Sequence, residues 1–289
     1  MFITDGGMET TLIFKQGLDL PYFAAFVLLD DPDGAEALRA YYRSYIEIAQ
    51  QRGVGIVVDT PTWRANPDWG EKLGYDAEAL AGVNRSAVAL LEELRTPEVR
   101  VSGCVGPRGD GYQVGTEMSP DEAERYHAPQ VETFAATTAD LISALTLTYA
   151  AEAVGIVRAA EETPVVISFT VETDGMLPSG QSLGEVIEQV DAETDAAAEY
   201  FMVNCAHPAH FADALEGRWL ERLRGVRANA SKKSHAELDE AEELDEGDPA
   251  ELADRYRELH KRLPNLSVVG GCCGTDHRHV DAVCAAVTG

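Results

Sequence analysis

The sequence predicts an α/β protein, a single (β/α)8 TIM barrel over residues 1–289. Short apolar segments of strand length alternate with longer segments in which apolar residues recur at helical spacing. This alternation repeats eight times, and no linker or low-complexity segment interrupts it. Strands that alternate with helices form a parallel sheet, and eight such units close into a barrel.

The first half of the chain contains four of these units. Its first strand leads into the turn Asp5-Gly6-Gly7-Met8-Glu9-Thr10, where the glycines permit a close approach of the backbone to a ligand. Asp33 is the expected N-cap of the first long helix, and Gly53 ends that helix. We expect strands over 2–4, 54–58, 99–103 and 141–147, and helices over 33–51, 76–95, 119–138 and 152–161.

The second half continues the pattern and contains one strongly acidic segment. The run 237–246 is expected to face solvent, because blocks of like charge are usually hydrated. We expect strands over 164–169, 200–205, 226–229 and 266–269, and helices over 182–197, after 208, from Asp248 and over 276–287.

Three cysteines follow the carboxyl ends of two predicted strands. Cys272 and Cys273 are adjacent and lie between the pair Gly270-Gly271 and Gly274, and Cys205 ends the sixth strand. Because these strand ends meet at one rim of a barrel, the three thiols should converge there. Three thiolates suit zinc and leave a fourth tetrahedral position open. Inert packing is the alternative for Cys205 alone; Cys104 is expected to lie too far away, and Cys284 inside a helix core.

Composition restricts the partners and the compartment. The formal net charge of −27, from 50 acidic and 23 basic residues, argues against nucleic acid and against anionic membranes. No apolar run reaches the length of a membrane span, and the amino terminus lacks the features of a signal peptide. Five cysteines, an odd number, are typical of free or metal-bound thiols. We therefore expect a cytoplasmic protein that acts on small molecules.

Several motifs resemble those of the homocysteine S-methyltransferase family, whose zinc-binding members are (β/α)8 barrels. The most specific are Val203-Asn204-Cys205 and the segment 270–275, and the others are residues 5–8, 62–66, 103–109, 168–169 and 174–175. The resemblance implies that a catalytic zinc is held by Cys205, Cys272 and Cys273. It also implies substrate binding by Asp5, Gly6, Gly7 and Asn204.

The resemblance further implies the reaction. A methyl group would pass from a sulfonium donor, S-methylmethionine or S-adenosylmethionine, or from betaine, to the thiolate of homocysteine, which gives methionine. A free thiol has a pKa of roughly 8.5, and coordination to zinc removes its proton. The acidic and aromatic rim near Trp63 or Glu172 is the expected place for a cationic donor.

Two positions depart from the family pattern. Glu9 stands where a glycine often follows the methionine of the first turn, and Leu145 stands where many members carry a glutamate that holds the substrate's amino group. A buried ammonium needs a charged or strongly polar partner, and Asp5, Glu172 and Asp174 are the candidates to supply it. Two alternatives stay open: a zinc-dependent alkyltransferase for another thiol or selenol, and a non-catalytic zinc- or thiol-binding barrel. We interpret Asp59, His207 and His210 as ordinary polar rim residues.

Overall fold

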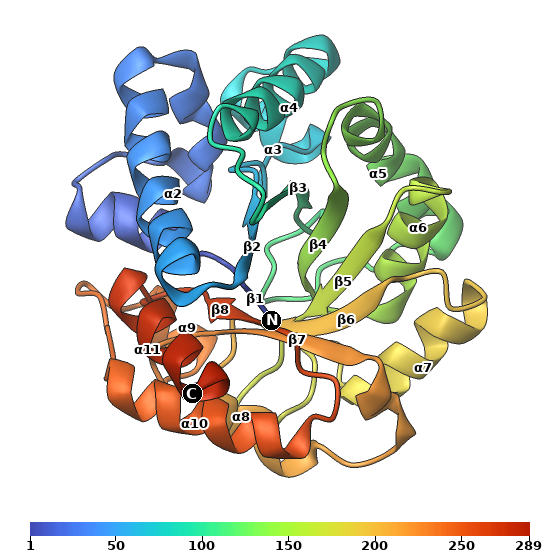
Figure 1. Ribbon diagram of the computed structural model, residues 1–289. Coiled ribbons are helices and arrows are strands. Elements are labelled where there is room, and N and C mark those ends of the chain that lie inside the picture. The colour runs from blue at the N-terminus through green and yellow to red at the C-terminus, as the bar shows by residue number, and fades with distance from the viewer.

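The computed structural model describes residues 1–289 and contains a closed barrel of eight parallel strands in chain order, surrounded by helices (Figure 1). The first strand, β1 (Phe2–Ile3), pairs with β2 on one side and with β8 on the other, which closes the barrel. This confirms the predicted fold. The remaining strands are β2 (Gly55–Asp59), β3 (Val99–Val105), β4 (Leu141–Leu147), β5 (Val165–Phe169), β6 (Tyr200–Asn204), β7 (Leu223–Ala228) and β8 (Val268–Gly271).

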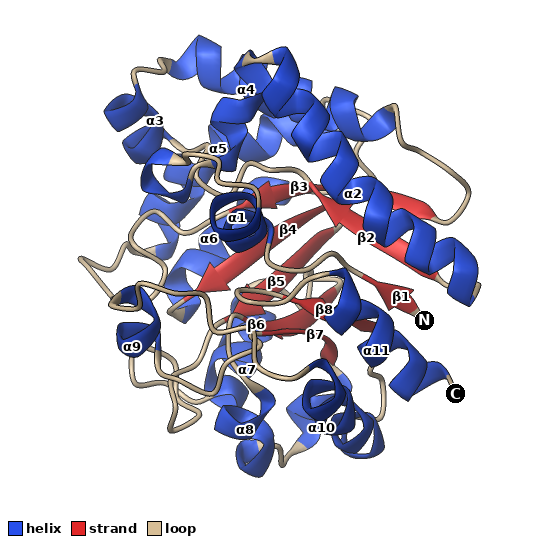
Figure 2. Ribbon diagram, turned by 90° about the vertical axis from the view of Figure 1, so that its left-hand side faces the viewer, coloured by secondary structure: helices blue, strands red, loops and turns tan.

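Seven long helices cover the outside of the barrel, and their apolar faces pack against the strands. They are α2 (Pro32–Arg52), α4 (Ala77–Glu92), α5 (Pro120–Ala135), α6 (Ala150–Ala160), α7 (Leu183–Glu193), α10 (Pro249–Arg262) and α11 (His277–Thr288). Four short helices complete the set: α1 (Met8–Thr10), α3 (Pro67–Leu73), α8 (Pro208–Phe211) and α9 (His235–Asp239). Figure 2 shows α1 and α9 at one end of the barrel and both chain termini at the other end.

Helix boundaries follow local capping chemistry. Ser119 begins α5 with a capping box, as its position before Pro120 predicts. The predicted cap at Asp33 is wrong: the side chain of Asp31 accepts a hydrogen bond of 2.8 Å from Gly34 N, and Pro32 occupies the first turn. Proline is favoured at that position because its missing N–H has no partner there in any case.

The eighth strand ends two residues later than its apolar run predicts, so that Gly270 and Gly271 belong to the strand. A Cβ at Gly271 would lie 1.9 Å from Thr275 Oγ1, and one at Gly270 would lie 1.9 Å from Thr4 Oγ1. Only glycine fits at these two positions, because Thr4 and Thr275 approach the backbone of the strand closely. The strand then places the following cysteines on the rim.

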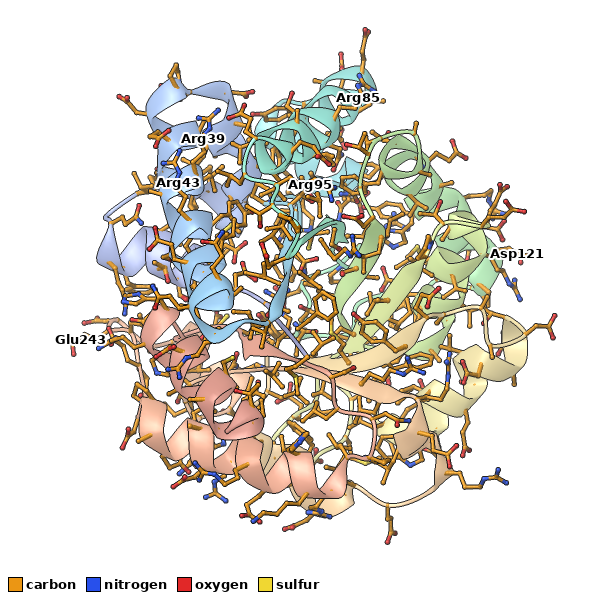
Figure 3. All side chains as sticks on the ribbon, in the orientation of Figure 1. Arg39, Arg43, Arg85, Arg95, Asp121 and Glu243 are labelled. Carbon is orange, nitrogen blue, oxygen red and sulfur yellow. The ribbon has the colours of Figure 1, made fainter.

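Most charged side chains point away from the barrel. Figure 3 shows labelled examples at the periphery, among them Arg39, Asp121 and Glu243. Many form surface ion pairs, such as Arg39 Nε to Glu93 Oε2 at 2.8 Å. None of the helices combines the length and the hydropathy that a membrane span requires.

Candidate metal centre and substrate pocket

The three predicted thiols meet at the carboxyl-terminal rim of the strands. The Sγ atoms of Cys205, Cys272 and Cys273 all lie within 4.8 Å of one another, and those of Cys205 and Cys273 are 3.5 Å apart. Sulfur atoms bound to one tetrahedral zinc at about 2.3 Å lie about 3.8 Å from each other. The spacing and the softness of the donors therefore fit a zinc ion. Cys104 is not part of the cluster, and Cys284 is buried in the helical layer, as predicted.

Cys205 is held by its backbone directly after β6. Its φ of +57° lies in the left-handed region, which a non-glycine residue seldom adopts. Its N–H donates to Arg227 O at 3.1 Å, and its carbonyl oxygen accepts from Asn229 Nδ2 at 2.9 Å and from His235 Nε2 at 2.6 Å. These bonds stabilise the strained turn and fix the direction in which the sulfur points.

Backbone hydrogen bonds also position the cysteine pair. Cys272 N donates to Ala228 O at 2.8 Å, and Cys273 O accepts from Ala230 N at 3.1 Å. The hydroxyl of Thr275 donates to Cys272 O at 2.7 Å. The loop after β8 is thus anchored to the end of β7, so the two thiols need little reorganisation to bind an ion.

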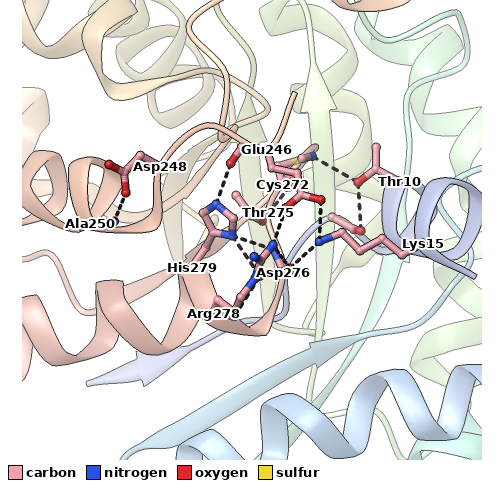
Figure 4. Close-up of polar contacts among 12 residues, drawn as sticks. Thr10, Lys15, Glu246, Asp248, Ala250, Cys272, Thr275, Asp276, Arg278 and His279 are labelled. Carbon is pink, nitrogen blue, oxygen red and sulfur yellow. Dashed lines mark hydrogen bonds and ion pairs between the residues drawn. The ribbon is translucent and has the colours of Figure 1, made fainter. Parts of the chain in front are cut away.

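An ion-pair cluster supports this loop from behind (Figure 4). Asp276, the N-cap of α11, accepts from Lys15 Nζ at 2.5 Å and from Arg278 Nη2 at 2.7 Å, and its Oδ1 lies 3.0 Å from His279 Nδ1. Burial raises the pKa of Asp276, but these three hydrogen bonds outweigh burial and hold that pKa well below its usual range. Glu246 also pairs with Lys15, at 3.1 Å. The acidic segment 237–246 is largely exposed, as predicted, but its last residue, Glu246, is held by this ion pair with Lys15.

The three thiols differ in how readily they lose a proton. Hydrogen bonds from Cys205 and Cys273 lower the pKa of Cys272 well below its ordinary value, and Arg227 acts in the same direction. The pKa values of Cys205 and Cys273 are raised, first by their hydrogen bonds within the cluster and then by burial. A cluster that already favours one thiolate attracts a divalent cation.

A pocket opens beside the thiols and brings together every residue predicted to form the site. It is lined by the three cysteines and by Asp5, Gly6, Gly7 and Asn204, together with Glu9, Phe23, Trp63, Tyr112, Leu145 and Arg227. A larger cavity of about 650 Å³ lies near the loop that follows β3, but none of the thiols lines it. We therefore place the chemistry in the thiol-lined pocket.

Arg227 is a site residue that sequence reasoning missed. It lies on β7, is 5% exposed, and forms ion pairs with both Asp5 and Asp59. Burial raises the pKa of Asp5 to about 7, and Arg227 opposes that shift. Asp59 is therefore a buried ion-pair partner and not an ordinary rim residue as predicted. An arginine inside a short apolar strand was the available signal, since a buried charge requires a partner.

Tyr112 is the second residue that was missed. Its hydroxyl lies 3.0 Å from Cys205 Sγ, and its ring packs against His235 with the ring centroids 4.5 Å apart. His235 Nδ1 in turn lies 2.9 Å from Glu172 Oε1. Tyr112 lies in a glycine-rich loop without periodicity, so the sequence contains no signal for this contact.

Asn204 lies in the pocket wall, but neighbouring groups already occupy its side chain. Its Oδ1 accepts from Thr146 N at 2.9 Å and from Ser168 Oγ at 2.6 Å, and its Nδ2 donates to Thr146 Oγ1 at 2.8 Å. The arrangement shapes the wall of the pocket and ties β4 to β5 and β6. Any role of Asn204 in substrate binding therefore stays a prediction.

The other predicted polar residues have local partners. His207 is buried and caps α8 by accepting from Ala209 N at 3.1 Å, and His210 Nε2 lies 2.9 Å from Lys232 O. Asp174 accepts from Met176 N at 3.0 Å. The contact of His210 agrees with its interpretation as a polar rim residue, whereas His207 is fully buried, has no hydrogen-bond partner at Nε2 and is therefore not an ordinary rim residue. Asp174 does not line the thiol pocket.

The fold and the site together define a (β/α)8 barrel protein whose rim gathers three cysteines that could hold a metal ion beside a pocket. The sequence model described as homocysteine S-methyltransferase matches residues 2–287. The chain therefore belongs to the homocysteine S-methyltransferase family and is a methyltransferase.

Similar proteins agree with this assignment. The homocysteine S-methyltransferase YbgG of Bacillus subtilis is 24% identical, and the match covers 99% of this chain and 94% of YbgG. Crystal structures of the homocysteine methyltransferase MmuM of Escherichia coli share the fold at 22% identity. The TM-score is 0.73 for the metallated form, with 99% of this chain and 96% of MmuM covered, and 0.76 for the oxidized form, with 99% and 95% covered.

Proposed function

We propose that this protein transfers a methyl group from a cationic donor to the thiol of homocysteine and so forms methionine. The donor is a sulfonium compound, S-methylmethionine or S-adenosylmethionine, or betaine. One observation carries the proposal: three sulfur atoms within 4.8 Å of one another adjoin a pocket whose other walls include Asp5, Gly6 and Gly7. We also propose that the protein acts in the cytoplasm, because all five cysteines are free thiols.

The cofactor that fits the donor set is zinc, held by Cys205, Cys272 and Cys273. Zinc bound there would act as a Lewis acid that lowers the pKa of the acceptor thiol. Three protein ligands leave one position of a tetrahedral ion for a substrate atom. The proposal thus assigns a ligand role to each thiol and a substrate-binding role to the turn after β1.

The residues that line the pocket would position the two reactants and limit the access of water to them. In the transfer, the bond between the methyl carbon and the donor heteroatom breaks, and its electrons stay with the donor, which becomes neutral. A new bond joins that carbon to the acceptor sulfur, whose proton has been released to solvent water before the transfer. Trp63, Phe23 and Tyr112 line the pocket, and aromatic faces stabilise a cationic donor.

Metal analysis and methyl-transfer assays test the proposal together. We expect about one zinc per chain, bound through three thiolates, and formation of methionine from homocysteine with at least one of the three donors. Cys273→Ser should lose both zinc and turnover. Cys284→Ala is the matched control, because Cys284 is buried in the helical layer and should keep both. A purified protein that binds no zinc, or that forms no methionine with any of these donors, would contradict the proposal.

Leu145 favours a second candidate, the alkylation of a thiol or selenol that carries no ammonium group. Its side chain is 7% exposed and belongs to an apolar cluster with Cys104, Val166 and Met202. A panel of thiols and selenols with and without an amino group distinguishes the two candidates by kcat/KM. Preference for acceptors without the amino group would support the second candidate.

A further inference from the structure

The thiol pocket contains one carboxylate that is not engaged by any other side chain, that of Glu9 on α1. We propose that Glu9 binds the ammonium group of the amino-acid thiol and thereby sets acceptor specificity. The inference rests on the proposed function and goes further, because it identifies the group that distinguishes homocysteine from a simple thiol.

Glu9 lines the same pocket as the three cysteines and is half-buried. Two guanidinium groups act on Glu9 from a distance, those of Arg227 and Arg64. Neither is bonded to it: Arg227 pairs with Asp5 and Asp59, and Arg64 donates to the carbonyl oxygens of Gly109 and Asp110. Burial raises the pKa of Glu9 to about 7, with a further contribution from the negative charge at Cys272. A backbone hydrogen bond and the distant Arg227 oppose this shift, but no side-chain cation pairs with the partly desolvated carboxylate, so a ligand cation that reached it would be bound with little competition.

The other carboxylates near the pocket are already paired. Asp5 and Asp59 share Arg227, and Glu172 contacts His235. Oδ1 of Asp59 is nevertheless buried without a hydrogen-bond partner. Because the pocket holds three carboxylates, at positions 5, 9 and 59, and one guanidinium, it can accept a positively charged group.

The wall formed by β4 cannot supply this contact. Leu145 offers no polar side-chain atom, and its backbone carbonyl accepts from Trp63 Nε1 at 3.2 Å. Many members of the family carry a glutamate at the position of Leu145, and many carry a glycine at the position of Glu9. The two departures are therefore complementary: the carboxylate absent from β4 is present on α1, in the same pocket.

Kinetics of Glu9→Gln test the inference, with two acceptors and the donor measured separately. The KM for homocysteine should rise roughly tenfold to a hundredfold, as expected for the loss of a charged hydrogen bond. The KM for 4-sulfanylbutanoate, which is homocysteine without its amino group, should stay within about twofold, as should the KM for the donor. Glu47→Gln, on the exposed face of α2, removes the same charge elsewhere and should change none of these values.

Binding of the product gives a readout independent of turnover. By calorimetry, Glu9→Gln should bind methionine roughly tenfold or more weakly but should bind 4-(methylsulfanyl)butanoate as the parent protein does. The double variant Glu9→Gly with Leu145→Glu, which restores the common pattern of the family, should recover part of the affinity for methionine. Thermal unfolding of each variant checks that it is folded.

The outcomes separate this inference from the proposed function. A parent protein that methylates homocysteine, with a Glu9→Gln variant that loses nothing, would overturn the inference and leave the function intact. A rise in KM for the donor alone would also overturn it, because Glu9 would then serve the sulfonium or ammonium donor. A parent protein that forms no methionine would contradict the proposed function itself.

Discussion

The two sides of the barrel rim differ in what they present to the pocket. Strands β6, β7, β8 and β1 supply soft ligands and charge: the three clustered thiols, Arg227 and Asp5. Strands β3 to β5 supply packing and neutral hydrogen bonds, from Cys104, Leu145, Thr146 and Ser168. The proposed chemistry and the charged contacts to the acceptor, including that of Glu9 on α1, therefore belong to one side, whereas the other side gives the pocket its shape.

Two cysteine substitutions, one on each side, give the largest expected contrast. Cys205→Ser should lose zinc and reduce methyl transfer more than about a hundredfold, because a direct ligand matters more than an outer contact. Cys104→Ser should keep its zinc, since Cys104 lies outside the thiol cluster. Zinc content and kcat/KM of both variants check this prediction. If both variants lost zinc to the same degree, the two sides would not differ as proposed.

Arg227→Met tests whether the charged side depends on its central cation. Removing the guanidinium leaves Asp5 and Asp59 buried without their partner, which should lower the free energy of unfolding by about 3–5 kcal/mol. The triple variant that also carries Asp5→Asn and Asp59→Asn should recover much of this loss, because no buried charge remains. Urea denaturation measures all three proteins, and a loss below about 1 kcal/mol in the single variant would show that the ion pairs contribute little.

Asp276→Asn tests the ion-pair cluster behind the cysteine loop. We expect the free energy of unfolding at pH 7 to fall by about 1–3 kcal/mol, because charged hydrogen bonds are lost. The folded pKa of Asp276 lies below its unfolded value near 3.8, so its contribution is complete above that pH and disappears as the pH falls further. Denaturation at pH 7 and near pH 3 should therefore show a smaller difference between variant and parent in acid. A difference that grew in acid would contradict the pairing.

Tyr112→Phe is expected to have the smallest effect. The variant loses the hydroxyl that lies 3.0 Å from Cys205 Sγ but keeps the ring against His235, so stability should hardly change. Zinc affinity should fall by up to about tenfold, because contacts to a ligand atom tune the metal. Competition with a chromophoric chelator measures this. If the zinc affinity of the variant were unchanged, the Tyr112 hydroxyl would have no effect on the metal, and Tyr112 would only line the pocket.

Much of the site could be predicted because it depends on strand ends. Cys205 and Cys273 are 68 residues apart along the chain, yet their sulfurs lie 3.5 Å apart, since the carboxyl ends of parallel strands share one rim. The place of Asp5, Gly6 and Gly7 on this rim follows from the same reasoning, whereas their substrate-binding role comes from the family resemblance and stays a prediction. Tyr112 and the partners of Arg227 could not be found, because a loop without periodicity and a charged residue within a strand do not identify their neighbours.

Local chemistry in the chain was enough to specify the alternating elements, the helix start at Ser119 and the type of ligand at the rim. These features depend on contacts between residues close in sequence and on the intrinsic affinity of thiols for soft cations. The shared pairing of Arg227 with Asp5 and Asp59, and the availability of the Glu9 carboxylate, arise only when the barrel closes. Closure brings charged side chains from distant strands together in a buried region, where an unpaired charge is unfavourable. Each charge is therefore either paired within the protein or available to a ligand.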